Sequence, residues 1–468
     1  MREYKVLHLF AGIGGGALGF ERARAEAAGL SGRYRTIGAV DFSEGAVRDF
    51  ETLVGRPATC ADLHTMTPDE LRAACGGEAP DVVFTSPPCK GFSGLLSNAQ
   101  SQSEKYQKLN ELVLKGLWLT LETFGERPPR LILLENVPRI AQRGADLLRK
   151  VKALLQGYGY RWDERTHDCG EIGGLAQRRR RFLLAARHEA TTPVLVYEPP
   201  TQRVRAVGEV LEQLPLPDDP AAGPLHRCPR LKWKTWVRLA LVPAGGDWRS
   251  LGTTQDGEPW RGRYAVVPWD QVGGTVTGNG YPSGSGVMAV ADPRFDCSPH
   301  APSVAVTGGG TPTSGGVCVA DPRIEGKGSR PDLFGVLRWD QPAKTISGSA
   351  SVSGSNTPAA VADPRIPADD DRPDPVPMII AEDGTWHRPL TTLELAALQS
   401  FPTTLADGSP LVLDGNSHTA WRERIGNAVP PDAAQAIAGS FLRALLLADA
   451  GQTFALGSTG AWVEEAPR

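Results

Sequence analysis

The chain has 468 residues, an apolar fraction of 41% and a formal net charge of −3. This length suits two or three domains, and the apolar fraction is that of a folded protein rather than a disordered one. The charge excludes a uniformly basic surface, although a local basic stripe is sufficient to bind nucleic acid.

Neither a membrane span nor a metal site is predicted. No apolar run reaches the roughly 18 residues of a spanning helix, and the first residues lack a signal-peptide pattern. The seven cysteines are scattered and form no Cys-x-x-Cys pair, which argues against zinc and against a disulfide framework. We therefore expect a cytoplasmic protein that contacts no membrane and binds no metal.

The first 190 residues alternate between apolar strands and helices. Strands are predicted over residues 5–10, 36–40, 81–85, 130–134 and 181–186, and helices from a Gly-rich turn to about residue 28, over 110–124 and over 145–156. Such alternation is typical of an α/β fold with a mostly parallel sheet covered on both faces. Ligands of these sheets bind beyond the carboxyl ends of the strands.

The composition changes near Pro199-Pro200, after which the chain is rich in Gly, Pro, Ser and Thr to about residue 377. Trp-Asp-Gln at 269–271 leads to Ala-Asp-Pro-Arg at 291–294, and the same pair recurs at 339–341 and 362–365, with a partial copy over 306–323. Two interpretations are open: a small solenoid-like array, or a duplicated strand-and-loop unit with a structural role. The recurrent arginines could read guanine, but we favour a structural role for them.

The last third predicts two helices, over about 393–400 and 431–447. Pro431 at the start of the second is tolerated because the first helical turn needs no hydrogen bond from that nitrogen. We expect these helices to return and complete the first domain.

Several polar or glycine-rich segments follow directly after predicted strands. Glycines over 10–16 allow a tight turn and the close approach of a ligand to backbone N–H groups. Asp41 ends the second strand, where a carboxylate can hold ribose hydroxyls, and Phe42 could stack on adenine. The alternative for Asp41 is the N-cap of the following helix.

Two further strand ends carry reactive groups. Pro87-Pro88 fixes the backbone that presents the Cys89 thiol, a nucleophile once deprotonated; the alternative is a buried structural cysteine. Glu135 lies at the end of the strand predicted over 130–134 and could donate a proton. The alternative is a glutamate that caps a helix or forms an ion pair. The arginines over 178–181 could hold an anion, or form a solvated charge run.

Together these segments resemble the DNA (cytosine-5)-methyltransferase family. The matching pieces, in family order, are residues 9–15, Asp41, Asp62, Ser86-Pro87-Pro88-Cys89, Glu135-Asn136-Val137, Gln177-x-Arg179-x-Arg181, 388–391 with 398–402, and 424–431. The resemblance covers about residues 1–190 and 385–447. It implies a Rossmann-like S-adenosylmethionine-dependent methyltransferase fold and a smaller β-rich target-recognition domain.

The resemblance also implies roles for individual residues. The catalytic residues would be Cys89, Glu135, Arg179 and Arg181. The residues that bind S-adenosyl-L-methionine would be Phe10, Gly12, Gly14, Gly15, Asp41, Phe42, Asp62, Pro88, Asn427 and Val429. The residues that contact DNA would be Lys90, Ser93 and Gln177.

The implied reaction is methylation of carbon 5 of a flipped cytosine in double-stranded DNA, through a covalent bond from Cys89 to C6. We expect a monomer, encoded by a prokaryote or phage, that serves restriction–modification or DNA protection, with any partner restriction endonuclease acting separately. The expected domains are 1–195 with 386–450 (catalytic), 196–385 (target recognition) and a tail over 451–468.

Two departures from the family leave alternatives open. Lys90 follows the nucleophile where the family has Gln, and Asp41 stands where Glu is commoner. Lys90 could bind a phosphate, lower the thiol pKa, or indicate a modified base or cofactor. A tRNA cytosine-5 methyltransferase is a further alternative, although the 185 or so residues of the middle segment favour DNA. A silent DNA-binding regulator would lack Cys89 or Glu135, and both are present.

Overall fold

The computed structural model describes residues 1–88, 104–193, 197–229, 240–244, 266–275, 289–292, 336–338, 360–362, 379–381 and 386–452. Two compact units are distinguished: unit 1 comprises 1–228, 270–287 and 390–468, and unit 2 comprises 229–269 and 288–389. The domain bounds expected from the sequence stay a prediction.

Unit 1 is built on one mostly parallel sheet. Its strands are β1 (Arg2–Leu9), β2 (Arg24–Ala27), β3 (Leu30–Asp41), β4 (Thr59–Cys60), β5 (Val82–Thr85), β6 (Leu131–Asn136), β7 (Tyr160–Asp168) and β8 (Arg180–His188). They lie in the order β2-β3-β1-β5-β6-β8-β7, with β4 also paired to β3. Strands β3, β1, β5 and β6 are parallel, whereas β2, β8 and β7 pair antiparallel with their neighbours. The Rossmann-like α/β fold predicted from the sequence is confirmed.

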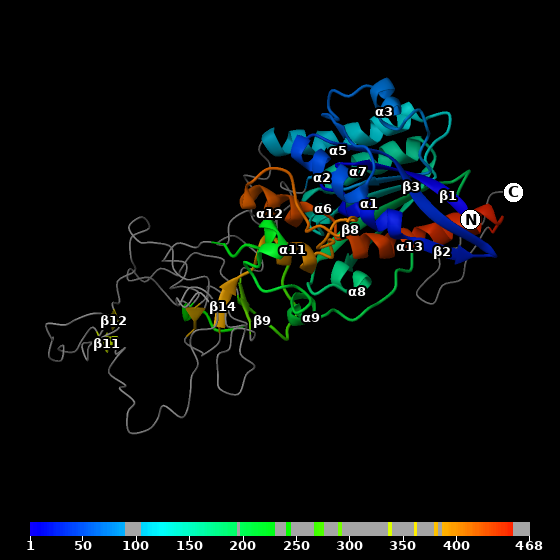
Figure 1. Cartoon of the computed structure of the whole chain (residues 1–468). Helices are drawn as coiled ribbons and strands as arrows, with labels where there is room; N and C mark the ends of the chain where they lie inside the picture. The colour runs from blue at the N-terminus through cyan, green and yellow to red at the C-terminus, as the bar shows by residue number, and fades with distance from the viewer. Residues whose placement is uncertain are drawn as a thin grey trace. The chain divides into compact units, whose positions relative to one another are not determined.

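Helices cover both faces of this sheet (Figure 1). Helices α3 (Pro68–Ala74), α5 (Glu104–Thr123) and α7 (Ala145–Gly157) share one apolar core with the sheet; α1 (Gly15–Arg22), α8 (Cys169–Gly173) and α13 (Pro431–Asp449) share the other. The remaining helices of unit 1 are α2 (Glu44–Val54), α6 (Ile140–Arg143), α9 (Val207–Leu211), α11 (Thr392–Leu398), α12 (His418–Asn427) and two 3-10 turns over Pro220–Ala222 and Pro224–His226. Because parallel strands must be buried on both sides, this arrangement follows from their continuous apolar sequences.

The C-terminal helices return to this core, as the sequence predicts. Ile437 and Phe441 of α13 are fully buried against the sheet face that carries Tyr4 and Val6. Helix α11 begins with a capping box, in which the Thr391 hydroxyl accepts from Glu394 N and the Glu394 carboxylate accepts from Thr391 N. Such a cap satisfies backbone donors that no helical carbonyl can reach.

Several elements differ from the sequence prediction, among them the first helix and strand β7. The first helix ends at Arg22 rather than near residue 28, because residues 24–27 form β2. Ala28 and Gly29 both have positive φ (48° and 76°), which is the backbone of a two-residue hairpin turn to β3. Strand β7 is also absent from the prediction, since its polar sequence has no apolar alternation to indicate a strand.

The described part of unit 2 contains short strands of repeated form. Strands β9 (Val266–Pro268) and β10 (Ala289–Ala291) are parallel and continue into a sheet with β14 (Trp386–Pro389) and β13 (Ile379–Ile380). Strands β11 (Val336–Arg338) and β12 (Ala360–Ala362) form a second parallel pair in the same register. The first strand of each pair directly precedes Trp-Asp-Gln and the second precedes Asp-Pro-Arg. Each full copy of the repeat therefore contributes two parallel strands in the same register; the partial copy lies outside the described residues.

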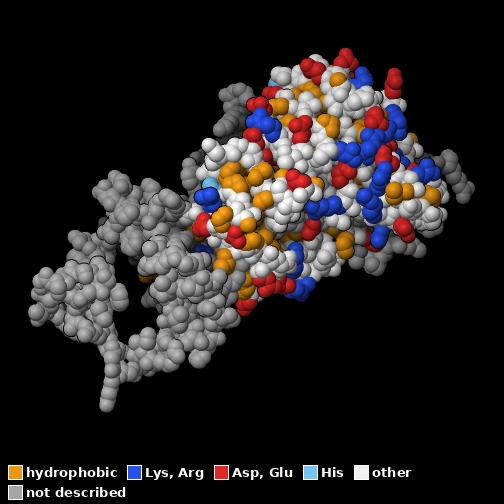
Figure 2. Space-filling view, viewed as in Figure 1, with side chains coloured by type: hydrophobic (Ala, Val, Ile, Leu, Met, Phe, Trp, Pro, Cys, Tyr) orange, Lys and Arg blue, Asp and Glu red, His pale blue; other side chains and the backbone are white. Residues whose placement is uncertain are grey.

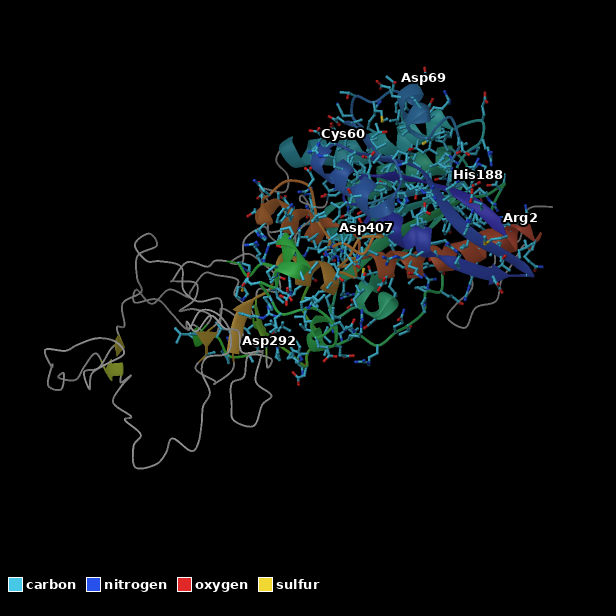
Figure 3. All side chains as sticks on the ribbon, in the orientation of Figure 1. Arg2, Cys60, Asp69, His188, Asp292 and Asp407 are labelled. Atoms are coloured by element: carbon cyan, nitrogen blue, oxygen red, sulfur yellow. The ribbon has the colours of Figure 1, made fainter. Side chains whose placement is uncertain are left out.

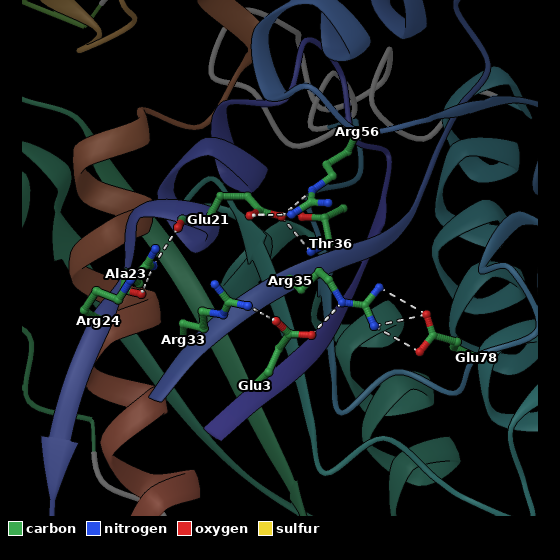
Figure 4. Close-up of polar contacts among 9 residues, drawn as sticks. All are labelled: Glu3, Glu21, Ala23, Arg24, Arg33, Arg35, Thr36, Arg56 and Glu78. Carbon is green, nitrogen blue, oxygen red and sulfur yellow. Dashed lines mark hydrogen bonds and ion pairs between the residues drawn. The ribbon is translucent and has the colours of Figure 1, made fainter. Parts of the chain in front are cut away.

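Arginines are numerous around the β1–β3 part of the sheet, but acids neutralise them. Glu3 pairs with Arg33 and Arg35 at 2.6 and 2.7 Å, and Arg35 also pairs with Glu78 at 3.0 Å (Figure 4). Figure 2 shows blue and red side chains intermixed on this face of the molecule. Exposed pairs of this kind contribute little stability, and their balance does not favour a binding face for nucleic acid. In the portion of the chain that the structure describes, no helix is long and apolar enough to cross a membrane.

Candidate functional site

The predicted site residues of unit 1 that the structure describes gather at one edge of its sheet. The register places Leu9, Thr85 and Leu134 side by side at the carboxyl ends of β1, β5 and β6. Strand β8 is antiparallel to β6, with Asn136 opposite Phe182. The start of β8, with Arg179 and Arg181, therefore lies at the same edge as the ends of the parallel strands.

The Gly-rich turn after β1 is held by Asp41 at the end of β3. Phe10, Gly12 and Gly14 have φ of 54°, 52° and 87°, a left-handed backbone that favours glycine. One Asp41 carboxylate oxygen accepts from Gly12 N at 2.8 Å and the other from Ser43 N at 3.0 Å. Burial raises the pKa of Asp41. The N-cap of α2 is Ser43, whose hydroxyl accepts from Ala46 N, so the interpretation of Asp41 as the cap is wrong.

An exposed aromatic ring lies beside this turn. Phe42 is 73% exposed, and its carbonyl accepts a hydrogen bond from the exposed Cys60 thiol at 3.5 Å (Cys60 is labelled in Figure 3). Asp62 follows β4, is exposed, and accepts from His64 N at 2.9 Å. Because Phe42 is exposed at the end of β3, its ring is accessible to a flat ligand that could stack on it.

Glu135 forms the centre of a buried polar group at the end of β6. It is 5% exposed; Oε2 accepts from the Ser86 hydroxyl at 2.7 Å, and Oε1 lies 3.0 Å from Arg181 Nε in an ion pair. Oε1 accepts no hydrogen bond of good geometry from the described residues. Oε1 therefore has hydrogen-bonding capacity that the described residues leave unfilled.

The backbone that leads to Cys89 is fixed from the same strand. Asn136, which is buried, donates from Nδ2 to the Pro87 carbonyl at 3.3 Å, and Pro88 is half-buried. Cys89, Lys90 and Ser93 themselves lie outside the described residues. Ser86 and Asn136 are positioning residues that the sequence did not single out, although both belong to the matched segments.

Two residues of the Gln-x-Arg-x-Arg segment are buried in contacts within unit 1. The Gln177 side chain donates to the Leu398 carbonyl and to Gln399 at 3.0 and 3.2 Å. Arg179 Nη2 donates to the carbonyls of Gly426 and Ala428 at 3.1 and 3.0 Å. Both side chains thus join the start of β8 to the returning segment. The assignment of Gln177 to DNA contact stays a prediction that its complete burial does not favour.

The returning segment also touches the Gly-rich turn. Asn427 is exposed and Val429 is 6% exposed. A Cβ atom added to Gly15 would lie 2.1 Å from the Val429 carbonyl oxygen, whereas at Gly12 nothing lies within 4 Å of it. Gly15 is therefore needed for close packing, and Gly12 for its backbone angle.

We expect Gly15→Ala to destabilise the protein by about 3 kcal/mol, the upper end of ordinary overpacking costs, because the obstacle is backbone. Gly439→Ala in α13 is the matched control, since its Cβ would meet nothing within 4 Å and alanine gains up to about 1 kcal/mol in a helix interior. Urea unfolding of both variants measures the difference. Shifts of equal sign in the two midpoints would contradict the steric explanation.

Among the described residues no group of three or more His, Cys, Asp or Glu side chains could hold a metal ion. The site is thus a set of glycine backbone, aromatic ring, carboxylates and arginines. It suits a nucleotide-like ligand at β1 and β3 and proton exchange at β6.

Part of the chain is similar in sequence to a family of known proteins. Residues 4–215 match the family model described as C-5 cytosine-specific DNA methylase. The type II methyltransferase M.XorII of Xanthomonas oryzae is 29% identical over 215 residues, which are 45% of this chain and 46% of that protein. The type II methyltransferase M.AgeI of Thalassovita gelatinovora is 31% identical over 39% of each chain. The chain spans less than half the length of both of these curated relatives.

Solved structures are similar over most of the chain at low identity. The Entamoeba histolytica methyltransferase EhMeth is 12% identical, with a TM-score of 0.49 and coverage of 96% of this chain and 99% of the other. A putative DNA modification methyltransferase from an Escherichia coli prophage is 17% identical, with a TM-score of 0.47 and coverage of 94% and 98%.

Proposed function

We propose, since residues 4–215 match the C-5 cytosine-specific DNA methylase family model, that this chain methylates carbon 5 of cytosine in double-stranded DNA. The observation that carries the proposal is the Glu135 carboxylate, buried between Ser86 and Arg181 next to the backbone that leads to Cys89. An acid and a cysteine nucleophile are the pair of groups that this chemistry needs. The type II relatives suggest a role in restriction–modification.

Cytosine C5 is a weak nucleophile until a covalent bond forms at C6. In the proposed reaction the Cys89 thiolate attacks C6, Glu135 protonates or hydrogen-bonds N3 as negative charge develops, and Arg181 holds the exocyclic O2. C5 would then take the methyl group as its bond to the cofactor sulfonium breaks, which leaves a neutral thioether. The C5 proton would pass to a base from solvent, the N3 proton would return to Glu135, and Cys89 would leave as a thiolate as the C5–C6 double bond re-forms. The cytosine must leave the base stack to reach these groups. Arg179, which binds the returning backbone, would act as a positioning residue.

The residues at β1 and β3 fit S-adenosyl-L-methionine, which would supply the methyl group on its sulfonium. The glycine turn leaves backbone open to a ligand, Asp41 suits ribose hydroxyls, and the exposed Phe42 ring suits adenine. Gly14, Asp62, Pro88, Asn427 and Val429 would complete this site. Lys90 and Ser93 would contact DNA next to the flipped base.

The proposal predicts 5-methylcytosine as the product. Wild type is incubated with labelled S-adenosyl-L-methionine and either unmethylated DNA or tRNA, and the nucleosides are separated by mass spectrometry. We expect label in DNA cytosine for wild type and for the control Cys228→Ala, and none for Cys89→Ala, because the covalent step is lost.

Turnover by Cys89→Ala would refute the covalent scheme. Label in tRNA alone would refute the DNA substrate. A labelled base other than cytosine would point to Lys90, and Lys90→Gln is then the variant to test.

A further inference from the structure

His167 of β7 lies next to the Glu135–Arg181 pair but belongs to none of the matched motifs. It is paired directly opposite Arg181 across the β7–β8 ladder. Residues directly opposite each other on neighbouring strands share a face of the sheet, with Cβ atoms about 5 Å apart. Arg181 in turn lies 3.0 Å from Glu135, so three strands bring these side chains together on one face.

The His167 ring is anchored on its other side. Its Nδ1 lies 3.3 Å from the Tyr197 hydroxyl. The Tyr197 ring is 8% exposed and stacks on Phe441 of α13, with ring centroids 5.0 Å apart and planes 14° apart. A ring that is stacked and hydrogen-bonded has little rotamer freedom, so Tyr197 fixes the imidazole.

The imidazole is kept uncharged by its surroundings. Burial lowers the pKa of His167 to about 4, with Glu135 opposing this shift and Arg181 reinforcing it. The Tyr197 hydroxyl and Nδ1 share one hydrogen bond, in which the donor depends on the ring tautomer. Nε2 is buried and has no hydrogen-bond partner among the described residues, a cost that an apolar side chain would avoid.

We propose that His167, anchored by Tyr197, is a positioning residue that holds the Arg181 guanidinium against the Glu135 carboxylate. An uncharged ring at this place packs against Arg181 without competing with it for Glu135. The same pair would meet the cytosine, so the inference rests on the proposed function and adds to it the residues that align the pair. Among the described residues, Asp168 also acts on the charge of this ring, and Cys169 and Arg165 act on that of its anchor.

The test is a double-mutant cycle on the full chain. Tyr197→Phe keeps the stacked ring and removes only the hydroxyl; His167→Leu keeps the volume and removes the imidazole. We expect each to lower kcat for methyl transfer about tenfold, the effect of one lost hydrogen bond, with unchanged affinity for S-adenosyl-L-methionine. The double variant should also lose about tenfold rather than a hundredfold, because both act through one contact. His167→Asn, whose amide can still accept from Tyr197, should restore most of kcat.

Tyr158→Phe is the matched control, since this hydroxyl contacts Glu122 on the other face and kcat should not change. The proposal would be overturned if each single variant kept kcat within twofold of wild type. It would also be overturned if the loss in the double variant equalled the product of the two single losses.

The ring itself gives a readout that needs no activity. Nitrogen NMR shifts of His167 in the wild-type chain should report an uncharged ring, and Tyr197→Phe should shift the Nδ1 signal. If wild type makes no methylcytosine but Tyr197→Phe shifts the Nδ1 signal, the proposed function fails and the anchoring stands; an Nδ1 signal that Tyr197→Phe leaves unchanged overturns the anchoring alone.

Discussion

Glu135→Gln is expected to lower the rate of methyl transfer by about 10²- to 10⁴-fold, the usual contribution of a positioned acid or base. Glutamine keeps the shape and can still accept from Ser86, but it cannot exchange a proton with N3. It also leaves the Arg181 guanidinium, which is 13% exposed, without its anion. The loss should therefore appear in the chemical step and not in cofactor affinity, which depends on groups at β1 and β3.

The measurement is a single-turnover rate at saturating DNA and cofactor, since this isolates chemistry from product release. Glu189→Gln is the control, because this exposed acid pairs with Arg161 at 2.8 Å on the surface. Ser86→Ala should fall between them, with about a tenfold loss for one hydrogen bond to the carboxylate. A Glu135→Gln rate within threefold of wild type would exclude Glu135 as the proton donor.

The position of this site could be predicted from the sequence because it depends on one rule. In a parallel sheet the carboxyl ends of all strands lie at the same edge, so the polar residues that follow the strands gather there. Asp41, Ser86 and Glu135 each follow an apolar run, so their convergence required no knowledge of side-chain contacts. Arg181 obeys the rule for a different reason: its strand is antiparallel, and the start of β8 rather than its end lies at this edge.

What the sequence could not predict depends on contacts between distant segments. Asp41 could be an N-cap or a ribose ligand until the Gly12 N contact and the Ser43 cap were visible. The function of Gly15 depends on Val429, which lies more than 400 residues away. His167 lies in a polar strand whose sequence shows no apolar alternation, so the sequence does not predict the strand. The role of His167 follows only from its pairing with Arg181 on the neighbouring strand.

The repeated Asp-Pro-Arg units show the same limit, and Asp292 gives the clearest case. An Asp-Pro-Arg turn can pair its aspartate with the arginine two residues later, but Arg294 lies outside the described residues. In the structure Asp292 Oδ2 accepts from Arg388 Nε and Nη2 at 2.9 and 2.7 Å, and both side chains are almost completely buried (0% and 2% exposed). Arg388 lies on β14, opposite Val290 of β10. The aspartate that directly follows β10 therefore joins this strand to β14 through a buried ion pair within unit 2.

Asp292→Asn is accordingly expected to destabilise the β13-β14-β10-β9 sheet by about 3–5 kcal/mol, because arginine stays charged and is left buried without its counter-ion. Hydrogen exchange at the amides of β10 and β14 measures this locally, where a global unfolding midpoint would average over both units. Asp270→Asn, an exposed aspartate of the same repeat, should change exchange by less than about 0.5 kcal/mol. Replacing both partners, Asp292→Leu with Arg388→Met, should recover most of the loss, since a buried ion pair gains little over well-packed apolar groups. A single variant as stable as wild type would mean that the pair is solvated in solution, and the repeat would then need another explanation for its aspartate.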